Sequence, residues 1–288
     1  MVVTVGFFDG VHIGHRRVIA TLLERGEDAV AVTFWPHPRV ALQQDASLLK
    51  FIDSPTEKAA LLRSLGLSDV RIINFDRAFA ALTAEEFIRE YLVKQVGCTC
   101  LVLGSDNHLG SDALDYQGLK PICDRLGIET VIVPPCFMDG SKVSSTRIRT
   151  SIAAGRVEEA ARMLGRPYSL DGVVVSGNRI GRTLGFPTAN LKLSFPLKVV
   201  PAGGVYASES IIGGRRYRSM TNIGVRPTVA TGPEVVIETN IFDFDEDIYG
   251  HELRLEFLSR IREEVKFSSL EALAEQLDKD RKKCRCIK

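Results

Sequence analysis

Several features that would assign this chain to a special class are absent or weak. Six cysteines in 288 residues are too few for a disulfide scaffold, so a reducing, cytoplasmic setting is expected. No apolar run reaches the roughly 18 residues that a membrane span needs. No basic segment precedes the short apolar run at the start, which argues against a signal peptide. The net charge of +1 gives no overall basic field for binding DNA or RNA, so no nucleic-acid partner is expected. Since no apolar run is long enough to span a membrane, no membrane association is expected either.

The composition that remains is that of an ordinary globular protein, with 45% hydrophobic and 25% charged residues. This length accommodates one large domain or two ordinary ones. The pattern of short apolar runs changes near residue 166. We therefore predict two domains, residues 1–166 and 167–288.

The first half alternates short apolar runs with helical segments. The predicted strands are Val2–Val5, Ala29–Phe34, Val70–Phe75, Cys100–Leu103 and Thr130–Val133. This order is typical of a parallel sheet covered by helices on both faces. Ligands of such sheets lie beyond the carboxyl ends of the strands. His12, His37 and the loop from Gly104 all follow strand ends, so we expect them to meet at one crevice.

The second half reads as many short strands separated by turns, with Gly213-Gly214 as a tight hairpin signal. A small antiparallel barrel is predicted. Ser268-Ser-Leu-Glu271 has the form of a capping box, which predicts a final helix to about Lys282.

The stretch from Val2 to His15 reads as a strand, a glycine- and aspartate-bearing loop and a helix start. Unpaired backbone N–H groups and the helix dipole favour an anion there. His12 and His15 stand three residues apart, so both imidazoles face the same side of a helical turn. Two imidazoles beside backbone amides can stabilise the charge that builds on a phosphorus centre under attack. We therefore predict phosphate chemistry at this stretch.

Lys142 to Arg149, KVSSTRIR, places hydroxyls at the start of a helix and basic side chains one turn later. Ser145, Thr146 and Arg149 could form a second phosphate clamp with the backbone amides. The alternative is an ordinary N-cap followed by exposed arginines.

The second half carries another candidate site. A glycine-rich segment, Gly177 to Gly185, precedes Phe186-Pro-Thr-Ala-Asn190. Alternation along an extended segment puts Thr188 and Asn190 on one face, where their oxygens suit a Mg²⁺ shared with nucleotide phosphates. Glu238 could accept or orient a hydroxyl proton, although an ordinary solvent-facing strand residue is the alternative.

The chain resembles the prokaryotic bifunctional riboflavin kinase/FMN adenylyltransferase family, also called FAD synthetases. The matching segments are GFFDGVHIGH, FWPHP, LTAEEFI, KVSSTRIR, LGRPY, GRTLGFPTAN, NIGVRPT and DIYG. The resemblance implies an α/β nucleotidyltransferase-type domain followed by a β-barrel of the riboflavin-kinase type. The barrel would phosphorylate riboflavin to FMN with ATP, leaving ADP. The first domain would adenylate FMN to FAD and release pyrophosphate.

The resemblance also implies the site residues. His12, His15 and Arg149 would act on the ATP phosphates, and Glu238 would be the catalytic base of the kinase. Thr188 and Asn190 fall on the Mg–ATP motif, so Mg²⁺ is the expected metal and ATP the co-substrate. The other implied ATP-binding residues are Gly6, Phe7, Asp9, Gly10, Asp106, Lys142, Ser145, Thr146, Gly177, Gly181 and Arg182.

Departures from the family pattern follow the fourth strand. Asp106 and Gly110 are kept, whereas Asn107 and Leu109 replace aromatics and the following arginine is missing. Aromatics there would stack on a flavin ring, a contribution of roughly 0.5–1.5 kcal/mol per pair, so FMN binding is the step affected. In the second domain, Asn240 stands where a histidine is common.

Three interpretations follow. The favoured one is the bifunctional enzyme, and the second is a riboflavin kinase with a weakened or retargeted adenylyltransferase domain. The third is a class I aminoacyl-tRNA synthetase, whose two signature motifs resemble HIGH and KVSST. The near-neutral charge and the lack of an anticodon-reading region count against it.

Two further features admit a metal. Cys98/Cys100 and Cys284/Cys286 could bind zinc, but their spacing is unusual for zinc, so buried thiols and a frayed terminus are expected. The acidic segment Asp243 to Asp247 lacks the glycine and final Glu of a calcium loop and is expected to be a solvated hairpin loop.

Overall fold

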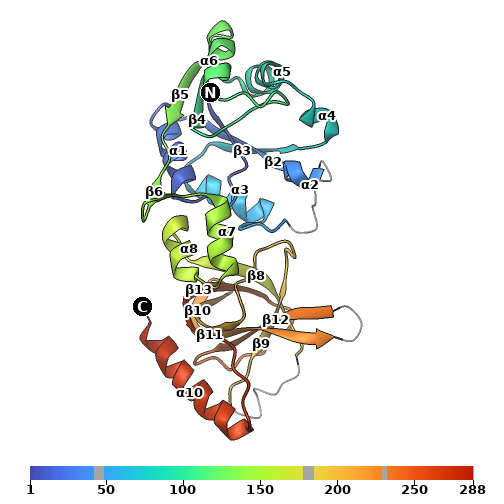
Figure 1. Ribbon diagram of the computed structural model, residues 1–288, viewed down its shortest axis with the longest axis vertical. Helices are drawn as coiled ribbons and strands as arrows, with labels where there is room; N and C mark the ends of the chain where they lie inside the picture. The colour runs from blue at the N-terminus through green and yellow to red at the C-terminus, as the bar shows by residue number, and fades with distance from the viewer. Residues whose placement is uncertain (42–48, 178–184, 229–231, 288) are drawn as a thin grey trace. The chain divides into compact units, whose positions relative to one another are not determined.

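The computed structural model describes residues 1–41, 49–177, 185–228 and 232–287. The chain forms two compact units, Met1–Ser145 and Thr146–Lys288, each with its own sheet (Figure 1). The break between the two compact units follows Ser145 and therefore lies before the domain boundary predicted at residue 166. The reason is that two helices before residue 166 belong to the second compact unit. The boundary at 166 between functional domains stays a prediction.

The first unit is built on a five-stranded parallel sheet in the order β3-β2-β1-β4-β5. Its strands are β1 (Val2–Val5), β2 (Ala29–Trp35), β3 (Asp69–Asn74), β4 (Cys100–Gly104) and β5 (Glu129–Val133). All five coincide with predicted strands to within one residue at each end. The predicted parallel sheet is confirmed.

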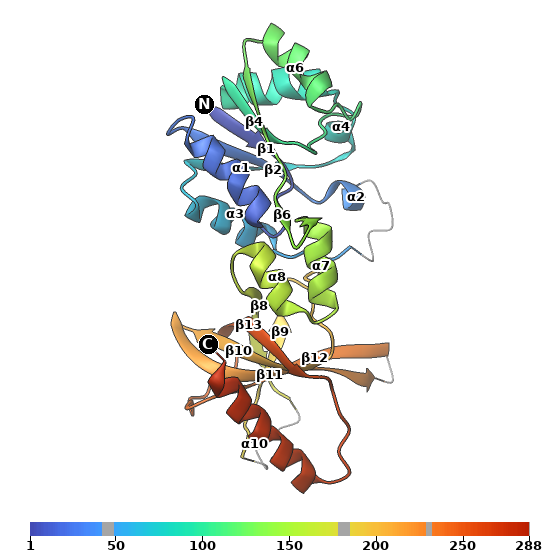
Figure 2. The ribbon, with the colours of Figure 1, turned by 60° about the vertical axis from the view of Figure 1, so that its left-hand side comes forward.

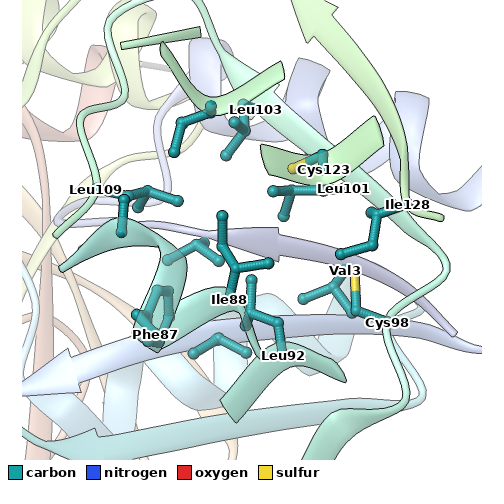
Figure 3. Close-up of a cluster of buried hydrophobic side chains, with 14 of the residues drawn as sticks. Val3, Phe87, Ile88, Leu92, Cys98, Leu101, Leu103, Leu109, Cys123 and Ile128 are labelled. Carbon is teal, nitrogen blue, oxygen red and sulfur yellow. The ribbon is translucent and has the colours of Figure 1, made fainter. Parts of the chain in front are cut away.

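Helices cover both faces of this sheet, since alternate residues of each strand enter different cores. Val3 and Leu101 pack with η2 (Ile88–Val96), α5 (Ala84–Phe87) and α6 (Tyr116–Arg125) in the cluster of Figure 3. Their strand neighbours Val2 and Val102 pack on the other face with α1 (Ile13–Leu23) and α3 (Pro55–Ser64). Strands buried on both faces become apolar throughout, which is why they were recognisable in the sequence.

Two helices of the first unit begin at capping boxes. The Ser54 hydroxyl accepts from Glu57 N at 3.2 Å, and the Glu57 carboxylate accepts from Ser54 N at 2.7 Å. Thr83 and Glu86 repeat this arrangement at the start of α5. The short helices α2 (Pro38–Ala41) and α4 (Arg77–Ala80) and the hairpin of β6 (Phe137–Met138) and β7 (Ser141–Lys142) were not predicted.

The second unit contains α7 (Ser145–Ala153) from its second residue onward, α8 (Val157–Leu164) and a closed antiparallel barrel in the order β10-β11-β12-β9-β8-β13. The barrel strands are β8 (Tyr168–Val175), β9 (Ala189–Leu193), β10 (Gly204–Ile212), β11 (Arg215–Thr228), β12 (Gly232–Ile241) and β13 (Glu252–Arg262). Gly213 and Gly214 have φ of 54° and 81° and form the predicted hairpin turn between β10 and β11. The predicted barrel is confirmed.

The last helix, α10 (Leu270–Cys286), lies beside the barrel (Figure 2). Its N-cap is Ser269, whose hydroxyl accepts from Ala272 N at 3.2 Å, so the cap predicted at Ser268 is wrong by one residue. Leu277 and Cys284 pack against barrel residues such as Val205 and Met220. Cys98 and Cys100 are buried, as expected for structural thiols. Cys284 is also buried and α10 continues to Cys286, so the expectation of a frayed terminus is wrong. None of the helices in the described ranges combines the length and apolar character needed to span a membrane.

Candidate active sites

The loop between β1 and α1 has an unusual backbone. Phe8, Gly10 and Val11 have positive φ values of 54°, 84° and 39°. Positive φ in a bulky non-glycine residue is uncommon and concentrates at functional sites. Phe8 and Val11 are held in this conformation by burial in the core, at 4% and 0% exposure. The loop is therefore a rigid support for the start of α1.

His12 and His15 lie together at that helix start. Their rings stack with centroids 3.6 Å apart and planes inclined by 16°. His12 is the N-cap residue, and its Nδ1 accepts from His15 N at 3.3 Å. Gly14 makes room for the pair, since a Cβ there would lie 3.1 Å from the His12 ring. The prediction that both imidazoles share one side is confirmed.

Both imidazoles are neutral near pH 7. Burial lowers the pKa of His12 from 6.5 to about 4, with the charges of Asp106 and Lys142 opposing each other. Burial, followed by the charges of His12 and Lys58, lowers the pKa of His15 well below its usual value. In the described part of the chain, nothing within hydrogen-bonding distance satisfies the buried His15 Nδ1. A buried nitrogen of this kind is suited to a ligand or water.

A buried lysine that the sequence analysis missed supports the same loop. Lys58 on α3 is 2% exposed, and its Nζ donates to Phe7 O and Thr33 Oγ1, each at 2.9 Å. Nζ also lies 4.0 Å from the centroid of the Phe7 ring. Burial lowers the pKa of Lys58 to about 8, although the carboxylates of Asp9 and Asp53 raise it. Lys58 stands four residues before Leu62 and therefore on the same helical face, and this spacing was the signal in the sequence that Lys58 is buried.

Loops from three strand ends meet beside these residues, as predicted. Asn107, after β4, donates from Nδ2 to Val5 O at the end of β1 at 2.6 Å. His37, after β2, packs edge-on against Phe7 with ring centroids 4.4 Å apart. Asp106 forms an ion pair with Lys142. The ends of β1, β2 and β4 thus form one site within the first unit.

Contacts inside this unit bear on the expected roles of Leu109 and Asp9. Leu109 is 6% exposed and points into the core beside Phe87 (Figure 3), so in this chain its side chain is part of the core. The Asp9 carboxylate accepts from Ile52 N at 2.9 Å, and the Asp9 carbonyl accepts from Ser145 Oγ at 2.8 Å. Asp9 is therefore first an anchor between segments, and its contact with ATP stays a prediction. Loop packing, which the sequence does not specify, decides both cases.

The rest of the predicted clamp belongs to the second unit. Arg149 Nη2 donates to Thr146 Oγ1 at 3.1 Å within the first turns of α7. This contact shows the two side chains on one helical face. Their role toward ATP stays a prediction.

The barrel unit contains two cavities that share a wall. The first, of about 370 Å³, is lined by Pro187, Thr188, Thr239 and the segment from Phe244 to Tyr249. The second, of about 350 Å³, is lined by Thr188, Asn222, Glu238, Asn240 and residues of α10. Thr188 lines both cavities. A group at Thr188 can therefore contact ligands in either one.

Backbone and amide contacts hold this wall in place. Asn240 Nδ2 donates to Pro187 O, directly before Thr188, at 2.7 Å. Asn190 is 9% exposed, and a Cβ at Gly177 would lie 2.3 Å from its Nδ2. Gly177 is thus required for the position of Asn190, which explains one glycine of the glycine-rich segment. Gly181 and Arg182 lie outside the described residues.

Glu238 lies on β12 between Asn222 of β11 and Asn190 of β9. It faces the second cavity together with Thr188, so the purely solvent-facing alternative is not supported. The acidic residues from Asp243 to Asp247 are exposed, so the predicted solvated loop is confirmed. The loop joins β12 to β13, which are not neighbours in the barrel order, so it is not the expected hairpin, and its residues from Phe244 to Asp247 also line the first cavity. Nothing in its composition signalled a cavity wall.

The donor set fits magnesium rather than zinc. No cluster of three or more His, Cys, Asp or Glu side chains suitable for a metal occurs among the described residues. Thr188 and Asn190 provide a hydroxyl and an amide oxygen, and Asn190 is fixed by its close packing on Gly177. Mg²⁺ accepts few protein oxygens when nucleotide phosphates and water complete its octahedral shell.

Comparison with known proteins settles the family. The FAD synthetase family matches residues 1–147, and the riboflavin kinase family matches residues 164–288. A bifunctional riboflavin kinase/FMN adenylyltransferase from Bacillus subtilis is 35% identical, covering 97% of this chain and 90% of that protein. The Escherichia coli protein of the same description is also 35% identical with the same coverage. The chain belongs to the bifunctional riboflavin kinase/FMN adenylyltransferase family.

A solved structure agrees with this membership. A crystal structure described as a macrolide-efflux protein from Streptococcus pneumoniae is 37% identical, with a TM-score of 0.93. The similarity covers 99% of this chain and 94% of the Streptococcus pneumoniae chain. The predicted family and the two predicted activities, riboflavin kinase and FMN adenylyltransferase, are confirmed at the level of family and domain. The aminoacyl-tRNA synthetase alternative is not supported.

Proposed function

We propose that the two cavities beside Thr188 hold the two substrates of the kinase. The cavity lined by Phe244 to Tyr249 takes ATP, and the cavity that contains Glu238 takes riboflavin. The shared Thr188 wall is the single observation that carries this proposal, because phosphoryl transfer requires donor and acceptor to meet in line. Glu238 accepts the proton of the riboflavin hydroxyl as its oxygen attacks the γ-phosphorus and ADP leaves.

Thr188 and Asn190 are the residues proposed to hold Mg²⁺ with ATP. When bound, the ion would neutralise phosphate charge during the transfer. Asn240 keeps Thr188 in place through the Pro187 carbonyl. Gly177 leaves room for the Asn190 amide, so the protein's own contribution is a preformed pair of oxygen donors.

In the first unit, we propose that His12 and His15 bind the ATP phosphates during adenylation. A phosphate oxygen of FMN attacks the α-phosphorus, and pyrophosphate leaves. Neutral imidazoles can donate hydrogen bonds without carrying charge, and the unsatisfied His15 nitrogen supports such a contact. Lys142, three residues before Ser145 at the helix start, already pairs with Asp106. Thr146 and Arg149 remain proposed phosphate contacts, and the cytoplasmic location remains a proposal.

A coupled product assay tests this division of labour. We expect purified protein with riboflavin, ATP and Mg²⁺ to form FMN first and FAD afterwards. FMN as the final product would instead support the alternative of a weakened or retargeted adenylyltransferase. Separation of the flavins by chromatography over time gives the answer.

Two variants should divide the activities. His15→Ala is expected to lower adenylation at least about tenfold, equivalent to roughly 1.4 kcal/mol, and to let FMN accumulate. Thr188→Ala should stop phosphorylation of riboflavin while added FMN is still converted to FAD. Thr188→Ser, which keeps the hydroxyl, is the matched control for Thr188→Ala. His251→Ala, which removes a histidine of the second unit, is the matched control for His15→Ala. Comparable loss of both activities in either test variant would contradict the proposal.

A further inference from the structure

A buried carboxylate lies where the last helix meets the barrel. Asp280 of α10 is 0% exposed, the least exposed acidic side chain in the described part of the chain. Its Oδ2 accepts from Arg262 Nε at 2.7 Å, and its Oδ1 accepts from Gln276 Nε2 at 2.8 Å. A buried charge that loses its partner is strongly destabilising, so this pair keeps helix and barrel in one arrangement.

The barrel partner of Asp280 belongs to the cavity that contains Glu238. Arg262 is the last residue of β13 and lines that cavity. Its guanidinium is further fixed by Nη1, which donates to Glu263 O at 2.9 Å, and by the Phe267 ring, 5.6 Å away. Phe267 lines the same cavity. Asp280 therefore fixes a residue of the cavity wall without lining the cavity itself.

The helix supplies the opposite part of the same wall. Leu273 and Leu277 of α10 line the cavity, and they stand seven and three residues before Asp280. These spacings place all three side chains on one face of the helix. The contact that holds Asp280 against Arg262 therefore also holds Leu273 and Leu277 against the cavity.

We propose that Asp280 is a positioning residue for the riboflavin kinase reaction. It fixes Arg262 and α10 together, and thereby closes the riboflavin side of the cavity next to Glu238. This inference rests on the proposed function, since it takes that cavity as the riboflavin site. Without the Asp280 carboxylate, the wall loosens, and riboflavin binds more weakly while the ATP side is unchanged.

The test compares two aspartates of the same helix. Asp280→Asn removes the buried charge with little change in shape, and we expect the KM for riboflavin to rise at least about fivefold. The KM for ATP and the adenylation rate of the first unit should stay within about twofold. Asp278→Asn is the matched control, because Asp278 pairs with Arg281 and Lys282 on the exposed side, where its side chain is 37% exposed. A loss of folded protein alone would lower the apparent kcat and leave KM unchanged.

Two further measurements keep the proposal falsifiable if Asp280→Asn folds poorly. Gln276→Ala removes only the bond to Oδ1 and should raise the KM for riboflavin about twofold. Arg262→Gln combined with Asp280→Asn should raise it no more than Arg262→Gln alone, because the two residues act through each other. Additive effects, or an Asp280→Asn variant that matches Asp278→Asn, would overturn the proposal.

The outcome is distinguishable from failure of the proposed function. If Glu238→Gln still phosphorylates riboflavin, the cavity assignment itself is wrong. If Glu238→Gln is inactive and Asp280→Asn has the riboflavin KM of the unsubstituted protein, the assignment stands and only the positioning role of Asp280 is refuted.

Discussion

The two candidate sites handle ATP with different chemistry. The first unit presents two stacked imidazoles at a helix start, with ionisable groups such as Lys58 and Asp106 close enough to influence their pKa values. The barrel presents the neutral hydroxyl of Thr188 between two cavities, with the carboxylate of Glu238 facing the second one. The first site relies on backbone and imidazole donors. The second is suited to a metal ion, so the two should respond differently to substitution and to pH.

The largest expected effect is at the barrel carboxylate. Glu238→Gln keeps the shape but cannot accept the riboflavin proton, so phosphorylation should fall by about 10²-fold or more, as is typical for loss of a general base. Adenylation of added FMN should be unchanged. Separate assays of ATP consumption with riboflavin and of pyrophosphate release with FMN measure the two effects.

Glu209→Gln is the control for this variant. Glu209 is on the same barrel but forms a surface ion pair with Arg216. Such pairs contribute little, about 0–1 kcal/mol, so both activities should stay near those of the unsubstituted protein. Equal losses in the two glutamine variants would remove Glu238 from the catalytic role.

The next largest effect concerns acid stability in the first unit. Because the folded-state pKa of His12 is about 4 and the ordinary value is 6.5, the unfolded chain takes up the proton first. Stability should therefore fall as the pH falls from about 6.5 to about 4, by on the order of 2 kcal/mol between pH 7 and pH 5. His12→Asn should reduce this loss, since an Asn can cap the helix but does not titrate.

Thermal unfolding of both proteins at pH 7 and pH 5 measures this difference. His15, whose pKa is also lowered, remains in the variant, so some acid sensitivity should persist. An unchanged shift in midpoint between the two proteins would mean that His12 is not buried in its neutral form.

The smallest expected effect is at Gly177, the glycine beside the Asn190 amide that we propose as a metal ligand. Gly177→Ala would place a Cβ 2.3 Å from Asn190 Nδ2, so the amide must move. We expect phosphorylation to fall about tenfold, equal to roughly 1.4 kcal/mol. The loss should be the same at pH 6 and pH 8, because neither Thr188 nor Asn190 titrates in that range.

Steady-state kinetics at several Mg²⁺ concentrations would sharpen this prediction. A displaced Asn190 should increase the Mg²⁺ concentration needed for half-maximal rate. A rate loss that is independent of Mg²⁺ would indicate that Asn190 serves another purpose.

Local signals in the sequence were sufficient for most of the fold. The capping boxes at Ser54 and Thr83 depend on contacts three residues apart, so they can be read from the chain directly. The strands of the parallel sheet are apolar on both faces and therefore stand out. His12 and His15 were recognisable because one helical turn fixes their relation.

Residues whose roles depend on distant partners were not predictable in the same way. Lys58 and Asp280 have the composition of solvent-facing helical residues, and only their contacts with Thr33 and Arg262 reveal that they are buried. Leu109 stands where the family pattern has an aromatic residue, and only the fold of the loop places it in the core. Tertiary packing decides whether a charged side chain, or the side chain at position 109, is buried, and one sequence does not specify that packing.

The position of Thr188 on both cavities has an evolutionary consequence. A bulkier residue there would narrow both cavities, so under the proposed assignment a change in flavin preference at this position would also alter the use of ATP. Leu277 borders one cavity and Tyr249 the other. A residue that borders only one cavity can change without narrowing the other cavity. We therefore expect enzymes with new flavin preferences to differ at positions such as Leu277 rather than at Thr188.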